Sequence, residues 1–332
     1  MARNGDASGE DTLISRYFKP LATDPGAFGL TDDAAVLKAD GFDIVVNTDA
    51  IVEGVHFLPD DPADTVARKA LRVNLSDLAA KGAAPAGFVL TLALRETGHA
   101  WLSEFARGLG EDAKFFGCPL LGGDTVSTPG PLMISITAFG RVPAGKMVRR
   151  LGAAVGDRVV VTGTIGDAAL GLAVRKGGAV AQALADDAAS SDTLVSRYRV
   201  PQPRGALAQA VRDHASAAMD VSDGLAGDLA KLCAVSGVSA DLEVDKVPLS
   251  IAARSLVERG MIGIEAIVAG GDDYEILCAI PDNRFEAFVR DARSAGVAVT
   301  AIGTIIEGPA KPRWLDARGR SIVLSRTSYS HF

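Results

Sequence analysis

Short runs of apolar residues alternate along the chain with longer segments in which apolar residues recur every three or four positions. The short runs predict β-strands, because a strand buried on both faces carries an almost continuous apolar sequence. These runs are residues 42–46, 88–94, 131–142, 157–161, 241–244, 274–280 and 297–306. The mixture of strands and helices in both halves of the chain predicts an α/β or α+β fold.

Helical periodicity is clear in the segment 63–83, where Val66, Ala70 and Val73 share one face of a predicted helix. Asp64 is placed to cap the N-terminus of this helix. Other helices are predicted at residues 101–116, 167–176 and 285–295 and after Pro203. No segment recurs with a fixed period, so a repeat protein is not expected.

A segment of small residues, LGAAVGD (151–157), follows the strand pattern of the first half of the chain and predicts a domain junction near residue 150. We therefore predict an N-terminal domain over residues 11–150 and a C-terminal α/β domain over residues 151–332, since a chain of 332 residues is long for one core. The polar residues 1–10 are predicted to be a disordered tail. The Ala-rich segment 178–192 is predicted to be a mobile excursion.

Composition narrows the class of protein. The chain is 48% hydrophobic and 23% charged with a net charge of -7, which is typical of a soluble globular protein. An acidic chain without clustered Lys and Arg is not expected to bind nucleic acid. No apolar run approaches the ~20 residues of a membrane helix, so no contact with a membrane is expected.

The cysteines and the N-terminus indicate a compartment. Cys118, Cys233 and Cys278 are few, odd in number and far apart, which favours reduced, buried thiols over disulfides or a zinc site. The N-terminal sequence MARNGDASGEDT lacks the apolar core of a signal peptide. We therefore expect a cytoplasmic protein.

Six short segments place carboxylates beside small residues at the ends of apolar elements. They are TDDAAV (Asp32, Asp33), NTDAIVEGVHF (Asp49), NLSD (Asp77), GGDT (Asp124), DVSDG (Asp220, Asp223) and GGDDYE (Asp272, Asp273). Each segment alone is ordinarily a helix cap or a turn. Together they predict a cation site, because half-buried carboxylates without a positive partner are costly.

The available ligand atoms are oxygens from carboxylates, Thr48 and backbone carbonyls, with no matching set of His or Cys. Oxygen ligands favour Mg²⁺, Mn²⁺ or Ca²⁺ over zinc or copper. Mg²⁺ usually completes its shell with water and phosphate oxygens, which indicates a nucleotide. Gly122 and Gly123, just before Asp124, suit a close approach of backbone to phosphate. The P-loop and protein-kinase motifs are both missing, and the glycine turn at 163–166 is interpreted as structural.

The ordered segments resemble the thiamine-monophosphate kinase family over nearly the whole chain, from Glu10 to the closing YSHF. The resemblance rests on GEDTLI, TDDAAV, TDAIVEGVHF, VNLSDLAAKGAAP, LLGGDT, RRLGAAVGD, MDVSDGL and GGDDYEIL. It implies transfer of the γ-phosphoryl group of ATP to thiamine monophosphate, assisted by several Mg²⁺ ions. It also implies a two-domain fold similar to aminoimidazole ribonucleotide synthetase. The N-terminal domain would bind ATP and Mg²⁺ and form a homodimer through its sheet.

The resemblance assigns roles residue by residue. Metal ligands are implied at Asp33, Asn47, Thr48, Asp49, Asp77, Asp124, Asp220 and Asp223. Contacts with ATP are implied at Trp101, Gly123, Asp124, Arg150 and Ser222. Contacts with the substrate are implied at His56, Asp272 and Tyr329, although the family often has Glu at position 272. We expect no covalent or general-base residue, because a phosphate acceptor with a second pKa of about 6 is already largely ionised at neutral pH.

Three of these assignments have ordinary structural alternatives. Trp101 and Phe105 at helical spacing are typical of core packing, and His56 in an apolar context is typical of a structural histidine. Arg149 and Arg150 are typical of a solvated pair at a junction. The alternative functions are another ATP-using enzyme of the same superfamily and a catalytically silent regulator that binds a nucleotide or a thiamine phosphate. An ATP-turnover assay separates the silent regulator from the enzymes.

Overall fold

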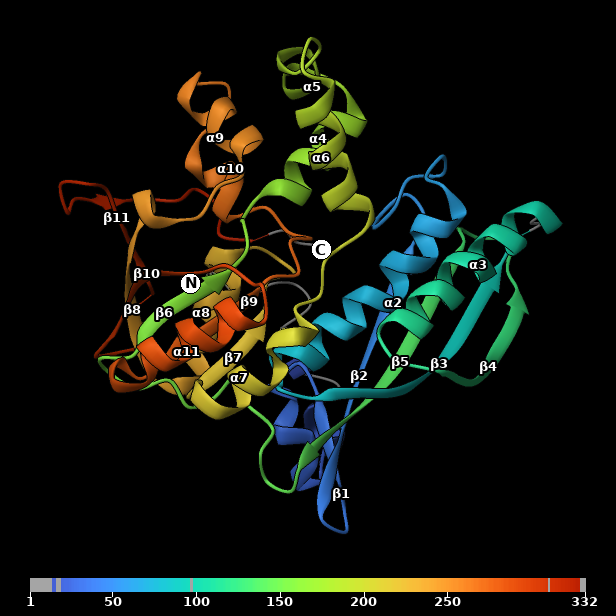
Figure 1. Cartoon of the computed structure of the whole chain (residues 1–332), viewed down its shortest axis with the longest axis horizontal. Helices are drawn as coiled ribbons and strands as arrows, with labels where there is room; N and C mark the ends of the chain where they lie inside the picture. Colours follow the sequence, from blue (N-terminus) through green and yellow to red (C-terminus); the bar gives the residue numbers. More distant parts are fainter. Residues whose placement is uncertain (1–13, 16–18, 96–97, 310, 329–332) are drawn as a thin grey trace, which may run out of the picture.

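The computed structural model describes residues 14–15, 19–95, 98–309 and 311–328. Its strands form two β-sheets, one in each half of the chain (Figure 1). Among these residues, no helix combines the length and the apolar character that crossing a membrane needs. The predicted tail 1–10 and the predicted substrate contact Tyr329 lie outside the described residues.

The N-terminal sheet has the strand order β1-β2-β5-β3-β4, with β3 and β4 parallel and the other neighbours antiparallel. Its strands are β1 (Ala35–Ala39), β2 (Phe42–Val52), β3 (Ala84–Leu94), β4 (Leu120–Ser127) and β5 (Met133–Pro143). Strand β2 is longer than the predicted run 42–46, because it pairs with β5 along its whole length, from Phe42 opposite Pro143 to Val52 opposite Met133.

Helix α2 (Ala63–Ala80) lies between the two sheets. It packs on β2 and β5 of the N-terminal sheet and also contacts β7 and β9 of the C-terminal sheet. Helix α3 (His99–Phe115) packs against α2, and the short 3-10 turns η2 (Lys19–Leu21) and η3 (Pro25–Leu30) precede the first strand. Because α2 is covered from both sides, its charged residues are held close to groups from both halves of the chain.

The predicted face of α2 is confirmed, since Val66, Ala70 and Val73 are all buried. The predicted cap was wrong. The helix begins at Ala63 directly after a proline, with no side-chain cap, and Asp64 lies inside its first turn. This proline is the N-cap residue and has no side-chain oxygen to accept a hydrogen bond, and the acid one residue into the helix does not act as the cap.

The C-terminal sheet has the strand order β12-β11-β8-β10-β6-β9-β7, with β8 and β11 parallel and the other neighbours antiparallel. Its strands are β6 (Arg158–Thr162), β7 (Ala217–Asp220), β8 (Ser239–Glu243), β9 (Ile276–Ile280), β10 (Val299–Ile306), β11 (Arg313–Leu315) and β12 (Ser321–Ile322). Alternate residues of β6 fill different cores: Val159 and Val161 pack with α8, and Val160 packs with α7 and α11. The sheet is therefore buried on both faces there, as its continuous apolar sequence predicts.

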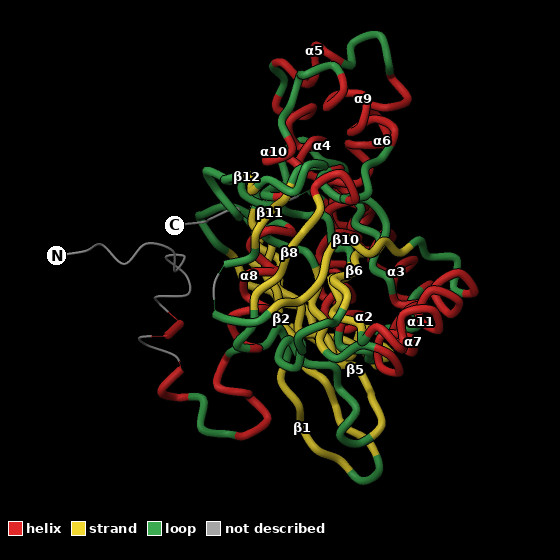
Figure 2. Tube along the Cα trace, turned by 90° about the vertical axis from the view of Figure 1, so that its left-hand side faces the viewer, coloured by secondary structure: helices red, strands yellow, loops and turns green. Residues whose placement is uncertain are grey.

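The helices of this half are α4 (Asp167–Lys176), α5 (Ala179–Ala183), α6 (Ala188–Arg199), α7 (Ala208–His214), α8 (Leu225–Ser236), α9 (Ile251–Glu258), α10 (Ile264–Val268) and α11 (Asp282–Ser294), with the 3-10 turns η4 (Gly205–Leu207) and η5 (Val244–Lys246). Both views place α4, α5, α6, α9 and α10 together at one end of the C-terminal sheet (Figures 1 and 2). The segment 178–192, predicted to be a mobile excursion, instead forms α5 and the start of α6, which Asp187 caps.

Cys118, Cys233 and Cys278 are free and buried, as predicted. Burial raises the pKa of the Cys118 thiol to about 11 and the pKa values of the other two thiols to about 12. The three thiols are therefore small core residues without nucleophilic character. The cytoplasmic location inferred from them stays a prediction.

Candidate active site

Three of the predicted metal ligands meet where α2 passes between the sheets. Asp77 lies on α2, Asp33 lies just before β1, and Asp220 is the last residue of β7. One carboxylate oxygen of each lies within 4.8 Å of the others, and Asp77 and Asp220 are buried. The segments TDDAAV, NLSD and DVSDG are therefore far apart in the sequence but adjacent in space.

Burial and neighbouring acids outweigh the positive charge near Asp77 and Asp220. Within the described part of the chain, neither carboxylate forms an ion pair. Burial, together with the charges of Asp220, Asp49 and Asp33, raises the pKa of Asp77 well above its ordinary value. Burial and the charge of Asp33 raise the pKa of Asp220 in the same way. Carboxylates held together at this cost are suited to bind a cation.

Strand β2 adds oxygen atoms to this cluster. The Asn47 side-chain amide donates a hydrogen bond of 2.8 Å to Asp77 Oδ2, and the Asp49 backbone N–H donates to Asn74 on α2. The Asn47 carbonyl oxygen is buried and has no hydrogen-bond partner among the described residues. Carboxylate and amide oxygens are the ligands that Mg²⁺ prefers, and a buried acceptor without a donor suits a cation. The residues present therefore fit Mg²⁺.

Asp33 differs from the other two acids because it already has positive partners. Lys81 Nζ lies 2.5 Å from Asp33 Oδ2, and the Arg150 guanidinium donates to Asp33 Oδ1. Burial opposes ionisation of Asp33, but these two charges hold its pKa below the ordinary value. The prediction of carboxylates without protein cations was wrong here, and the structural alternative of a solvated Arg150 is also wrong, since its side chain is 16% exposed. Lys81 was not singled out, and the pairing of Arg150 with Asp33 was not predicted, because both cations lie far from Asp33 along the chain.

The loop that carries Ser222 and Asp223 is held by one buried carboxylate. Asp228 Oδ2 accepts hydrogen bonds of 3.1, 3.0 and 3.2 Å from the backbone N–H groups of Ser222, Asp223 and Gly224. Lys231 pairs with Asp223 at 2.5 Å. Asp223 thus has a positive partner eight residues further along the chain. Neither Lys231 nor Asp228 was singled out in the sequence. Their position in the first two turns of α8, directly after the DVSDG segment, could have indicated that they contact its loop.

Two predicted ligands lie elsewhere on the N-terminal sheet. The Thr48 hydroxyl donates to the Ile136 carbonyl, on the face of β2 opposite to its neighbours Asn47 and Asp49. Asp124 lies on β4 opposite Thr91, three strands from β2, or about 14 Å at ~4.8 Å per strand. Within one chain, neither side chain joins the acidic cluster.

Gly123 and Trp101 have structural neighbours that account for them without a nucleotide. A Cβ atom at Gly123 would lie 1.9 Å from the Leu90 carbonyl oxygen of β3, so strand pairing alone requires glycine there. The Trp101 ring stacks on Phe105 with centroids 5.1 Å apart and planes 18° apart. Their contacts with ATP stay predictions.

The predicted substrate residues are joined by a lysine that the sequence did not reveal. Lys69 Nζ donates to the His56 carbonyl and to Asp272 Oδ2, each at 2.8 Å. The neighbouring Asp273 has a different role, because its carboxylate accepts from the Gly166 backbone N–H at the start of α4. The GGDDYE segment therefore carries one acid toward α2 and one structural cap.

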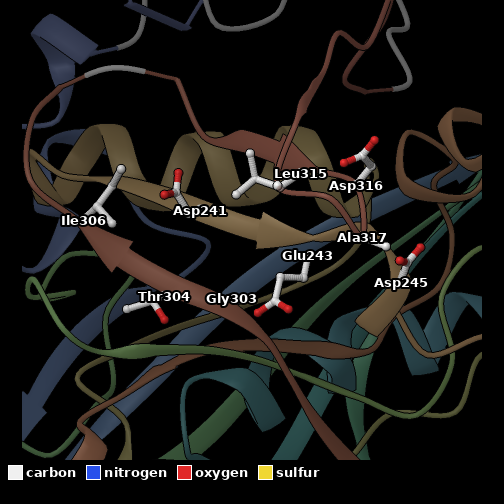
Figure 3. Close-up of a pocket in the computed structure, with 10 residues that line it drawn as sticks. Asp241, Glu243, Asp245, Gly303, Thr304, Ile306, Leu315, Asp316 and Ala317 are labelled. Carbon is white, nitrogen blue, oxygen red and sulfur yellow. The ribbon is translucent and has the colours of Figure 1, made fainter.

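A groove of about 400 Å³ lies on the open face of β8, β10 and β11, apart from the acidic cluster (Figure 3). Its acidic lining includes Asp241, Glu243, Asp245 and Asp316. Asp241 is paired with Arg313 at 2.6 Å, and Glu243 with Lys246 at the same distance. None of the predicted site residues lines this groove.

Comparisons with known proteins agree with this arrangement. The family described as AIR synthase related protein matches with its N-terminal domain at residues 31–142 and its C-terminal domain at residues 154–314, so the predicted two-domain fold is confirmed. The thiamine-monophosphate kinase of Caulobacter vibrioides is 43% identical over 331 residues, covering 96% of this chain and 89% of that protein. The thiamine-monophosphate kinase of Escherichia coli K12 is 38% identical, covering 98% of this chain and 99% of that protein.

A solved structure of AaThiL complexed with AMPPCP and TMP matches the fold with a TM-score of 0.83 and 27% sequence identity, covering 100% of this chain and 99% of that one. This chain thus matches its relatives in sequence and in fold over nearly its full length. The chain belongs to the thiamine-monophosphate kinase family of AIR synthase related proteins.

Proposed function

We propose that this protein transfers the γ-phosphoryl group of ATP to thiamine monophosphate and so makes thiamine diphosphate. The cluster of Asp33, Asp77 and Asp220 carries the proposal, because three carboxylates that could hold a cation meet between the two halves of a chain of this family. The related structure with AMPPCP, an ATP analogue, and TMP supports both substrates. The intact set of acids argues against a catalytically silent regulator, and ATP turnover separates the two functions.

We propose that Asp33, Asn47, Asp49, Asp77 and Asp220 hold Mg²⁺, with Asp223 holding a further ion. When bound, these ions would neutralise the phosphates of the two anionic substrates. Their residues come from the segment before β1, from β2, α2 and β7, and from the loop after β7, so the site forms only when both halves of the chain are folded together. Thr48 is retained as a proposed ligand through an atom other than its hydroxyl. Asp124 is retained as a proposed ligand in an assembly with a second copy of the chain.

The remaining residues position the substrates. Arg150 is suited to the phosphates of ATP, since a guanidinium binds anions. Ser222 is proposed to contact ATP through its hydroxyl, because its backbone N–H already donates to Asp228. His56 and Asp272 are proposed to contact the acceptor, together with Tyr329. No general base is needed, because the acceptor phosphate is largely ionised near pH 7. The transfer is therefore proposed to be direct, from ATP to acceptor in line.

Purified protein with γ-labelled ATP, Mg²⁺ and thiamine monophosphate should place the label in thiamine diphosphate, separated by chromatography. Thiamine itself should be a poor acceptor, because it offers no ionised phosphate. Without any acceptor, the denatured protein should stay unlabelled. Absence of turnover would favour the silent regulator, robust phosphorylation of thiamine with an inert monophosphate would contradict the acceptor, and label on an aspartate would contradict direct transfer.

We also propose a homodimer formed through the N-terminal sheet. Every residue of the edge strand β4 is exposed, including Leu120, Leu121 and Val126 at 52%, 62% and 45%. An edge strand with apolar side chains and unpaired backbone groups is an open pairing surface. Such an interface would bring Gly123 and Asp124 beside a second copy of the chain.

The dimer predicts a mass of twice 34.2 kDa in light scattering at micromolar concentration. Leu121→Asp should shift the protein to monomers, because it buries a charge in the proposed interface. Val323→Asp is the matched control, since Val323 is 89% exposed at the end of the C-terminal sheet. A monomeric wild type, or equal behaviour of the two variants, would contradict the proposed interface.

A further inference from the structure

Lys69 is a charged residue in the middle of α2, yet it is only 1% exposed. Its ammonium group donates to the His56 carbonyl and to Asp272 Oδ2, each at 2.8 Å, and lies 4.1 Å from the centroid of the Tyr198 ring. A buried ammonium is costly unless it is fully paired, and an apolar residue would fill the same space without that cost. The position of this lysine therefore requires an explanation beyond packing.

The two acceptors of Lys69 belong to segments that are distant in the sequence. His56 follows β2, and Asp272 lies 203 residues after Lys69. Tyr198 of α6 also donates to the His56 carbonyl, at 3.3 Å. The His56 ring is oriented by the Val52 N–H, which donates to Nδ1 at 3.0 Å, so the neutral ring carries its proton on Nε2. Both the backbone and the ring of His56 are thereby fixed.

The Asp272 loop is strained and closely held. Asp272 and Tyr274 have φ values of 71° and 51°, which residues with a side chain rarely adopt. Their backbone N–H groups donate to Ser222 and Val221, each at 2.8 Å. The Tyr274 hydroxyl donates to Asp272 Oδ1, and Lys69 takes Oδ2, so both carboxylate oxygens are oriented. The Asp272 side chain nevertheless stays 23% exposed, which leaves it accessible to a ligand.

We infer that Lys69 is a positioning residue for recognition of the phosphorylated acceptor, an inference that rests on the function proposed above. Its ammonium group joins the His56 loop of one half of the chain to the Asp272 loop of the other. Removing this charge releases Asp272 from its strained conformation and separates the two sides of the acceptor site. The ATP side, built on Arg150 and the Asp228-held loop, does not contact Lys69. The Asp272 loop donates to the backbone carbonyls of Ser222 and Val221. Asp228 holds the Ser222 loop through three other hydrogen bonds, so we expect the ATP side to keep its geometry.

Lys69→Met tests this inference, because methionine has nearly the same length without the charge. The KM for thiamine monophosphate should rise at least about tenfold, while the KM for ATP stays within about twofold. Backbone amide exchange at Asp272 and Tyr274 should become at least about tenfold faster, with α8 unaffected. Lys246→Met is the control, since Lys246 forms an exposed ion pair with Glu243 and should change none of these values.

Equal increases in both KM values, or unchanged exchange at Asp272 and Tyr274, would overturn the inference. If the wild-type protein does not phosphorylate thiamine monophosphate, the proposed function fails, and the exchange measurement still decides the role of Lys69. If Lys69→Met does not fold, Asp272→Asn breaks the same ion pair from the other side. It should speed exchange at Tyr274 and raise the acceptor KM, and wild-type values for that variant would equally overturn the inference.

Discussion

Replacing Asp77 by asparagine is expected to abolish turnover and, at the same time, to make the metal-free protein more stable. Turnover should fall by at least about 10²–10³-fold, the usual cost of removing one preorganised electrostatic group. Stability should rise because Asp77 is buried beside Asp220, Asp49 and Asp33, and asparagine keeps its shape without its charge. A residue that only supported the helix would show the reverse pattern.

The gain in stability should depend on pH. The pKa of Asp77 in the folded protein lies well above its ordinary value of 3.8, mainly because the carboxylate is buried. A raised acid pKa means that the folded state loses stability as pH rises from the unfolded value through the folded one. The variant should therefore match the wild type in stability near pH 4 and be more stable than the wild type at pH 8.

Thermal melting in EDTA and in Mg²⁺, with turnover measured on the same samples, tests this prediction. Mg²⁺ should raise the Tm of the wild type, as a ligand of the folded state does, and raise that of Asp77→Asn much less. Asp273→Asn is the matched control, because Asp273 is also buried with a raised pKa but lies outside the acidic cluster. It should keep the wild-type response to Mg²⁺. A less stable Asp77→Asn at pH 8 in EDTA would refute the assignment.

Local pattern predicted the elements of the fold better than their limits. The predictions of the apolar face of α2 and of the buried strand β6 were both correct, because each depends on the pattern of a single segment. The extension of β2 to Val52 was missed, since its second half, NTDAIV, carries polar residues that only pairing with β5 makes regular. The helices within 178–192 were missed because an Ala-rich sequence carries little periodicity.

The acidic cluster could be predicted from the sequence, but its counter-ions could not. Asp33 lies just before β1, Asp77 lies in the last turn of α2, and Asp220 ends β7, and the signal of a carboxylate near the limit of an apolar element is local. Lys69 lies within α2 and Lys81 is its C-cap, and nothing in the local sequence marks either residue. Only the packing of α2 between the sheets brings Lys81 to Asp33 and Lys69 to Asp272. The face that carries Thr48 was also missed, because residues 47–52 were not predicted as strand, and alternation along β2 turns Thr48 away from Asn47 and Asp49. Residue type thus predicts the chemistry of this site, while the topology of the fold decides which cations pair with its carboxylates.

Replacing Lys81 by methionine is expected to destabilise the metal-free protein by about 3–5 kcal/mol, the usual cost of removing one partner of a buried ion pair. Lys81 is fully buried, lies 2.8 Å from Asp32 and 2.5 Å from Asp33, and donates to the Ala218 carbonyl of β7. Burial opposes its charge, but the two aspartates raise its pKa above 10.5. Its contribution is thus fully present below the unfolded pKa, so the loss should be nearly constant between pH 6 and 9.

Mg²⁺ should then restore more stability to Lys81→Met than it adds to the wild type. If Asp33 is a metal ligand, a divalent ion supplies the positive charge that the variant lacks, and it no longer competes with an ammonium group. Melting of Lys81→Met and of the exposed control Lys246→Met, each with EDTA and with Mg²⁺, separates the two contributions. Equal gains from Mg²⁺ in wild type and Lys81→Met would show that Lys81 and the metal act on different carboxylates. A larger gain in the variant would place both cations on Asp33, where α2 joins the two halves of the chain.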